Sequence, residues 1–248
     1  MRILGLDFFE GLVSSAVDRA MSGGGLIVAP SGTCFTRLQT DRVYRAAMLR
    51  ADVVLPDSGL MVSLWRSLRG QSINRISGLA YLKELLDRPR FRQASVVWVL
   101  PDESARDVAL FWLRDHGFSS SATGSYVAPM YGSTVEDRSL LALIEEARPD
   151  HVVIGLSGGV QEKLAAFLRD AAAQQPAMAI HCIGAALGFV TGYQVAIPDW
   201  ADRLYLGWSI RLLANPRRFL PRALSAFALP GMIRKYGEAM PPMKDGAQ

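Results

Sequence analysis

The sequence predicts an α/β fold of the Rossmann-like type, a mostly parallel sheet with helices on both faces. Short apolar runs recur along the chain and alternate with stretches whose apolar residues are spaced three and four apart. Of the 248 residues, 50% are hydrophobic and 20% are charged, which is typical of a globular protein and excludes a disordered or fibrous chain. Because strand, helix and strand in succession form right-handed crossovers, we expect ligands at the carboxyl ends of the strands.

Short apolar runs rich in β-branched side chains predict strands that are buried on both faces. These runs are residues 26–29, 53–55, 96–100, 151–154 and 179–183. Apolar spacings of three and four predict the helices between and around them. These helices are residues 40–50, 79–87, 104–116, 135–147 and 160–174.

The strand signal stops after about Asp199, so we place a domain boundary there. Residues 1–199 form the predicted α/β domain, and residues 200–248 form a basic, helical C-terminal appendage. Just before the boundary, residues 177–198 contain no Asp, Glu, Lys or Arg, over a length that would suit a transmembrane span. Glycines and polar residues interrupt this stretch, so we interpret it as a strand, a glycine-bearing loop and a helix.

The net charge of +4 is unevenly distributed. Residues 203–235 contain seven Lys and Arg and no Asp or Glu, so the rest of the chain carries −3. Trp208, Phe219 and Phe227 are interspersed among these basic residues, which favours an anionic partner: a membrane surface, a phosphate-bearing ligand or nucleic acid. Nucleic acid is the least favoured, since no nucleic-acid-binding motif accompanies the charge. The alternative is a solvated basic helix face with no partner.

Two features concern the cellular compartment. Cys34 and Cys182 lie far apart in apolar surroundings, which predicts buried free thiols rather than a disulfide or a metal site. At the N-terminus, Asp7 and Glu10 interrupt the chain before an apolar run of secretory length can form. We therefore expect no signal peptide and a cytoplasmic protein.

Small glycine-bearing turns follow four of the predicted strands. They are Pro30-Ser31-Gly32-Thr33, Pro56-Asp57-Ser58-Gly59, the segment from Gly155 to Lys163, and Gly184-Ala185-Ala186. Such turns let backbone N–H groups approach a phosphate at a helix N-terminus. The alternative for any single turn is that its glycine only permits a tight connection between strand and helix.

Asp57 stands out because its carboxylate directly follows a buried apolar strand. In that position it is a candidate general base toward a sugar hydroxyl. The alternative, which the spacing favours equally, is that Asp57 is the N-cap of a helix running from Leu60 toward Leu68.

The absence of several motifs argues against some classes of catalytic chemistry. The sequence has no Asp-x-Asp pair and no His or Cys cluster at metal-ligand spacing, so it does not support a divalent-metal site. It also lacks a Walker loop and a Gly-x-Gly-x-x-Gly motif after the first strand, which argues against nucleotide hydrolysis and dinucleotide redox chemistry. His116, His151 and His181 are scattered, and we expect them to be structural.

Several short motifs, taken in their order and spacing, resemble the WecG/TagA/CpsF glycosyltransferases over nearly the whole chain. They are Val54-Leu55-Pro56-Asp57-Ser58-Gly59, Arg75-Ile76-Ser77-Gly78, Pro149-Asp150, Val153-Ile154-Gly155-Leu156-Ser157-Gly158, Gln161-Glu162-Lys163, Ile183-Gly184, Gly192, Trp208, Arg211-Leu212, Pro216 and Arg218. The resemblance implies an inverting transferase that needs no metal or other cofactor. Its donor would be a UDP-sugar, and its acceptor a polyprenyl-diphosphate-linked saccharide at the inner face of the bacterial cytoplasmic membrane. Members of the family build wall teichoic acid linkage units, enterobacterial common antigen and exopolysaccharides.

The resemblance also assigns roles to residues. Asp57 matches the family's proposed catalytic base, Arg75 a ligand-contacting arginine, and Gln161 and Glu162 a pair beside the nucleotide-sugar. The remaining substrate-binding candidates are Ser31, where the family usually has Asn, the turn glycines Gly155, Gly158 and Gly184, and the appendage arginines Arg211, Arg218 and Arg222. The appendage would close over the active site and contact anionic lipid. The chain could also form a homo-oligomer, which the sequence leaves undecided.

Departures from the family pattern leave the donor sugar open between a plain hexose and an N-acetylhexosamine. Gly188 is at the position where the family usually has Asp, and Ala196 is at the position of the Arg in an Arg-Ala-Pro turn. Gly207 replaces the usual Glu, and Leu100-Pro101-Asp102-Glu103 replaces a Gly-Gly loop. Two alternatives remain: a UDP-sugar-binding protein without transferase activity, and a peripheral membrane scaffold that uses only the basic appendage.

Overall fold

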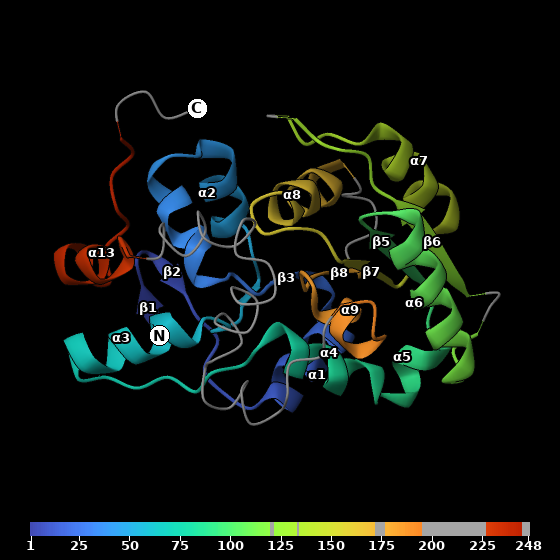
Figure 1. Cartoon of the computed structure of the whole chain (residues 1–248), viewed down its shortest axis with the longest axis horizontal. Coiled ribbons are helices and arrows are strands. Elements are labelled where there is room, and N and C mark those ends of the chain that lie inside the picture. Colours follow the sequence, from blue (N-terminus) through green and yellow to red (C-terminus); the bar gives the residue numbers. More distant parts are fainter. Residues whose placement is uncertain (120–121, 133, 172–176, 195–226, 245–248) are drawn as a thin grey trace.

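A computed structural model describes residues 1–119, 122–132, 134–171, 177–194 and 227–244 (Figure 1). Its centre is a six-stranded sheet in the order β4-β3-β8-β7-β5-β6, with every neighbouring pair parallel. The strands are β3 (Gly25–Val28), β4 (Val53–Val54), β5 (Val96–Leu100), β6 (Thr123–Val127), β7 (His151–Ile154) and β8 (Ala179–Cys182). A short antiparallel hairpin of β1 (Arg2–Ile3) and β2 (Leu6–Asp7) precedes the sheet.

Helices cover both faces of the sheet, as the sequence predicted; Figure 1 shows α2 and α8 on one side and α1, α4 and α5 on the other. The described helices are α1 (Val13–Gly23), the 3-10 helix η1 (Gly32–Gln39), α2 (Arg42–Leu49), α3 (Gly59–Arg69), α4 (Gly78–Leu86), α5 (Pro89–Gln93), α6 (Glu103–Asp115), α7 (Arg138–Ala147), α8 (Gln161–Ala171), α9 (Ala186–Val190) and α13 (Leu229–Tyr236). Successive strand residues enter opposite cores. In β5, Val97 and Val99 pack with the α2–α8 side, whereas Val96 and Trp98 pack with the α1–α4 side.

All five predicted strands are present within one or two residues of their predicted bounds, and the α/β fold is confirmed. The predicted helices are also present as far as the structure describes them, and side-chain caps fix the starts of α2, α4, α6 and α7. Asp137, for example, accepts a hydrogen bond from the backbone N–H of Leu140, so α7 begins at Arg138 rather than at Val135. The sequence reading missed β6, because this half-buried edge strand has no apolar run.

The order of the strands reverses between β3 and β8. β3 pairs with the next strand along the chain, β4, on one side and with β8 on the other. The loops that leave neighbouring strands at this point run to opposite sides, which opens a crevice at the carboxyl edge of the sheet. The predicted place for ligands therefore exists in the fold.

The C-terminal segment 227–244 packs against the rest of the chain. Leu229 and Ile233 of α13 are fully buried in the core that also contains α2 and α8. The backbone N–H of Leu4 donates to the carbonyl of Gly237, and that of Lys244 donates to the carbonyl of Gln39. The predicted domain boundary, however, lies within residues 195–226, outside the described part of the chain.

The uncharged stretch before residue 195 has the predicted structure as far as it is described. It forms β8, a turn at Gly184 and the short helix α9. Among the described residues, no helix is both long and apolar enough to cross a membrane.

Two buried histidines and a tyrosine form a hydrogen-bonded chain inside the core. His151 Nδ1 lies 3.1 Å from His181 Nε2, and His181 Nδ1 lies 3.0 Å from the Tyr81 hydroxyl. Burial lowers the pKa of His151 to about 4 and that of His181 well below its ordinary value. Both imidazoles are therefore neutral near pH 7, in agreement with a structural role.

This burial predicts a loss of stability in acid. A histidine that titrates near 6.5 when unfolded and near 4 when folded binds its proton first in the unfolded state. Stability is therefore fully present above about pH 6.5 and falls as the pH decreases toward 4. For His151 alone we expect the free energy of unfolding to fall by about 2 kcal/mol between about pH 7.5 and pH 5, measured by urea unfolding.

His151→Gln should reduce this pH dependence, because its amide does not titrate. His116→Gln is the matched control, since the side chain of His116 is 44% exposed and stacks on Trp112 at the surface. Equal pH dependence in His151→Gln and the unchanged protein would show that His151 does not control acid stability.

Candidate active site

Loops from the carboxyl ends of β3, β4, β5, β7 and β8 line an open cleft of about 220 Å³. The cleft lies at the crevice where the strand order reverses. Most of the predicted site residues line it: Ser31, Asp57, Arg75, Gly155, Gly158, Gln161 and Gly184. The structure thus brings together residues that are up to 153 positions apart in the chain (31 to 184).

Asp57 is half-buried in the cleft wall, and its carboxylate points to a helix other than the expected one. Its Oδ1 accepts a hydrogen bond of 2.9 Å from the backbone N–H of Gly78, the first residue of α4. The N-cap of α3 is Ser58, whose Oγ accepts from the backbone N–H of Met61. The alternative that Asp57 caps this helix is therefore wrong.

Arg75 fastens the Asp57 loop to the segment that leads into α4. Its Nε donates to the backbone carbonyl of Asp57 at 2.7 Å, and the backbone N–H of Ile76 donates to the carbonyl of Pro56 at 3.3 Å. Among the described residues that line the cleft, Asp57 carries the one carboxylate and Arg75 the one guanidinium. A carboxylate and a guanidinium thus share one end of the cleft.

Gln161 and Glu162 are adjacent in sequence but have different surroundings. The Gln161 side chain lines the cleft, and its Oε1 accepts from the backbone N–H of Gly184 at 2.9 Å. Glu162 is 0% exposed, and its Oε2 accepts from the backbone N–H of Gly159 at 2.6 Å. Burial raises the pKa of Glu162. Glu162 therefore supports the Gly158-Gly159 turn from behind, whereas Gln161 faces the cleft.

Backbone N–H donors at the start of α8 already form hydrogen bonds within the protein. The backbone N–H of Gly159 donates to Glu162, and those of Val160 and Gln161 donate to the carbonyl of Ser157. These three donors are used within the protein. The expected binding of phosphate by these backbone groups is thus not supported, and Arg75 provides the positive charge in the described cleft.

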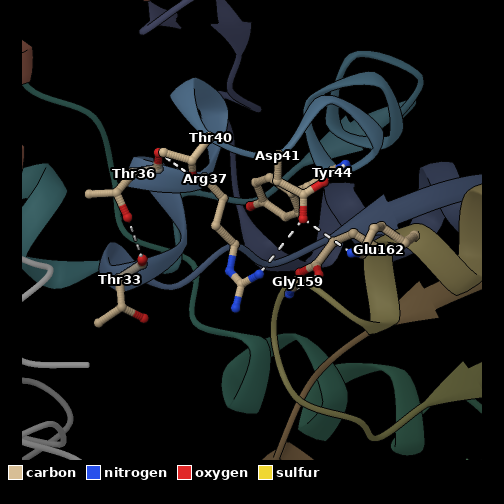
Figure 2. A network of polar contacts seen from close by, with 9 residues as sticks. Thr33, Thr36, Arg37, Thr40, Asp41, Tyr44, Gly159 and Glu162 are labelled. Atoms are coloured by element: carbon tan, nitrogen blue, oxygen red, sulfur yellow. Dashed lines mark hydrogen bonds and ion pairs between the residues drawn. The ribbon is translucent and has the colours of Figure 1, made fainter. Parts of the chain in front are cut away.

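Arg37 of η1 is a neighbour of the Gly158-Gly159 turn that the sequence reading missed. Figure 2 shows its side chain reaching from η1 toward Gly159, beside Asp41 and Glu162. Gly159 has φ +92°, and a Cβ there would lie 2.7 Å from Arg37 Cζ. Asp41 also accepts a hydrogen bond of 3.1 Å from Lys163 Nζ, which fastens α2 to α8. Arg37 thus lies against the turn and Asp41 is bonded to α8 next to it, neither residue lines the cleft, and no motif in the sequence marked them.

Ser31 and Gly158 lie close together in the wall of the cleft, and both lie next to Cys34. Ser31 Oγ lies 3.0 Å from Thr33 Oγ1 and 3.3 Å from the Sγ of Cys34. A Cβ at Gly158 would be 2.7 Å from the same Sγ, so a glycine is needed for this close packing. Cys34 and Cys182 are both buried free thiols, as predicted.

Other predicted residues are not placed by the structure. Arg211, Arg218 and Arg222 lie within residues 195–226, outside the described part of the chain. Within the described ranges, no group of three or more His, Cys, Asp or Glu side chains is arranged to hold a metal ion.

Comparison with known proteins agrees with the motifs. The profile of the Glycosyl transferase WecG/TagA/CpsF family matches residues 1–238. A characterised protein of Bacillus subtilis (strain 168), N-acetylglucosaminyldiphosphoundecaprenol N-acetyl-beta-D-mannosaminyltransferase, is 27% identical over 187 residues. The aligned region covers 72% of this chain and 67% of that relative.

Proposed function

Because the chain belongs to the WecG/TagA/CpsF family and is a glycosyltransferase, we propose that it transfers a sugar from a UDP-sugar to a polyprenyl-diphosphate-linked saccharide. The transfer proceeds with inversion and without a metal ion, at the inner face of the cytoplasmic membrane, in the synthesis of a cell-surface polysaccharide. The observation that carries this proposal is the cleft at the strand reversal, where Asp57 and Arg75 lie together.

In the proposed mechanism, Asp57 is the general base. Its carboxylate takes the proton of the acceptor hydroxyl while that oxygen attacks the anomeric carbon of the donor. The bond between that carbon and the diphosphate breaks in the same step, and UDP leaves with the electron pair. A single displacement of this kind inverts the anomeric configuration. The hydrogen bond from Gly78 holds the carboxylate in a fixed orientation.

Arg75 is proposed to contact the diphosphate of the donor. A guanidinium binds two phosphate oxygens at once, and its positive charge stabilises the negative charge that develops on the leaving UDP. Gln161, fixed between Gly184 and Glu162, supports the neighbouring wall of the cleft.

The acceptor is proposed from the Bacillus relative, whose name specifies an N-acetylglucosaminyl-diphosphoundecaprenol acceptor. We propose the same type of lipid-linked N-acetylglucosamine for this chain. The donor is a UDP-hexose or a UDP-N-acetylhexosamine.

A UDP-release assay tests the proposal. Purified protein is incubated with each UDP-sugar in a panel, with and without a polyprenyl-diphosphate-linked N-acetylglucosamine. We expect UDP release with at least one donor, dependent on the acceptor and unaffected by EDTA. If UDP binds in calorimetry but no donor is turned over, the protein is a nucleotide-sugar-binding protein and the proposed activity is wrong.

The basic appendage gives a separate prediction about the membrane. Replacing Arg211, Arg218 and Arg222 together by Gln should weaken binding to anionic vesicles by about 150-fold, since each basic residue near such a surface contributes about 1 kcal/mol. Sedimentation with phosphatidylglycerol vesicles at several salt concentrations measures this. Point substitutions are preferable to deletion, because deletion would remove the buried residues Leu229 and Ile233 from the core.

A matched control changes the same amount of charge elsewhere. Arg19, Arg66 and Arg90 are exposed arginines of the α/β body, and replacing all three by Gln should leave vesicle binding nearly unchanged. Equal weakening by both triple variants would mean that net charge, rather than the appendage, controls membrane binding.

A further inference from the structure

Gln194 lies in the wall of the cleft on the side away from Asp57. It lines the cleft together with Pro101, which follows β5, and Gly155, which follows β7. Asp57 follows β4, and β3 and β8 separate β4 from β7. The cleft therefore has a charged end at Asp57 and Arg75, and an end near β5 whose described lining residues carry no charge.

Gly188 of α9 makes room for the Gln194 side chain. A Cβ at Gly188 would lie 3.0 Å from Gln194 Cγ, 3.3 Å from Cδ and 3.4 Å from Nε2. The backbone N–H of Gln194 donates to the carbonyl of Gly188 at 2.8 Å. The Gln194 side chain thus lies over the Cα of Gly188, in space that any larger residue at position 188 would take.

The segment before Gln194 is fastened to the opposite loop. The hydroxyl of Tyr193 donates to the carboxylate of Asp102, with its oxygen 2.8 Å and 3.0 Å from the two carboxylate oxygens. Asp102 also caps α6 by accepting from the backbone N–H of Ala105. Gln194 is therefore held at the cleft edge by its neighbour on one side and by α9 on the other.

The side-chain amide of Gln194 forms no hydrogen bond with any residue in the described part of the chain, although it lies at the cleft wall. An amide offers one acceptor and one donor side by side, without charge. Its complement is a planar group with a donor next to an acceptor. The imide edge of uracil, an N–H flanked by carbonyl oxygens, is such a group.

We infer that Gln194 binds the base of the donor nucleotide, an inference that rests on the proposed function. With the sugar at Asp57 and the diphosphate at Arg75, the base of a UDP-sugar extends toward the uncharged end of the cleft. Gln194 Oε1 accepts from the uracil N3–H, and Nε2 donates to the adjacent carbonyl. Gln194 is thus a residue that binds the hydrogen-bonding edge of the base.

The test distinguishes binding of the base from binding of the diphosphate. Gln194→Met keeps the length of the side chain but removes both hydrogen bonds. Two neutral hydrogen bonds correspond to about a tenfold change in affinity, so Kd for UDP and for uridine should rise by about tenfold. Kd for inorganic pyrophosphate should stay the same. Gln71→Met is the control, since Gln71 is exposed and does not line the cleft, and it should bind all three ligands normally.

A second variant tests the packing against Gly188. Gly188→Val should displace the Gln194 amide and weaken UDP binding to a similar extent. In a Gln194→Ala background, the same substitution should cause no further loss, because the displaced group is absent. Circular dichroism of each variant checks that the fold is retained.

Other outcomes overturn the inference in distinguishable ways. Unchanged UDP binding by Gln194→Met would show that Gln194 does not contact the nucleotide. An equal loss of pyrophosphate binding would place Gln194 at the diphosphate rather than at the base. Failure of the unchanged protein to bind UDP would instead overturn the proposed function itself.

Discussion

Asp57→Asn is expected to lower the turnover of UDP-sugar by about 10²–10⁴-fold, the usual contribution of a general base. Binding of UDP should change little. Asn retains a carbonyl oxygen that accepts the hydrogen bond from the backbone N–H of Gly78, so the loop keeps its position. The variant removes the proton acceptor without removing the contact, and initial rates at saturating donor measure the effect.

Ser58→Ala is the matched control for Asp57→Asn. Ser58 is the adjacent residue and the actual N-cap of α3, so its loss should lower the free energy of unfolding by about 1 kcal/mol while turnover stays within a few-fold. If Asp57→Asn retained more than about a tenth of the rate, the carboxylate would be a structural ligand of α4 and the base would lie elsewhere.

The choice between cap and base at Asp57 illustrates what the sequence leaves undetermined. Asp57 and Ser58 are both good N-cap residues at the start of the same helix, and propensity alone does not separate them. The partner of Asp57 is Gly78, and only the tertiary fold brings these two residues together. Local signals therefore predicted the helix but not which residue caps it.

Gln161 and Glu162 show a second limit. Consecutive residues of a helix point about 100° apart, so one of them can face the cleft while the other faces the core. Both side chains are polar and both are nearly fully buried, at 2% and 0% exposed, so polarity alone does not show which of them lines the cleft. The structure buries Glu162 because a backbone donor, Gly159, is present to accommodate its carboxylate.

The position of the cleft, by contrast, was predictable. Buried apolar runs revealed most of the strands, and parallel strands place their carboxyl ends at one edge, so the loops after them had to gather there. The role of Gly188 was not predictable, because it depends on a contact with Gln194 that follows no sequence period.

Arg75→Ala is expected to weaken UDP binding and to lower kcat/KM by at least about 150-fold. Hydrogen bonds to a charged partner contribute about 1.5–3 kcal/mol each, and a guanidinium makes two with a diphosphate. Arg75→Lys keeps the charge but loses the planar fork, so it should recover only part of the affinity. Calorimetry with UDP and steady-state rates measure both effects.

Arg75 also holds the Asp57 loop through the backbone carbonyl of Asp57, so loss of activity alone does not prove contact with the diphosphate. The two roles differ in ligand dependence. A direct contact predicts weaker binding of UDP and of inorganic pyrophosphate but unchanged binding of uridine, whereas a loosened loop predicts a lower free energy of unfolding and a lower kcat with normal pyrophosphate binding. If Arg75→Ala binds pyrophosphate as tightly as the unchanged protein does, Arg75 positions Asp57 and the diphosphate is held by other groups.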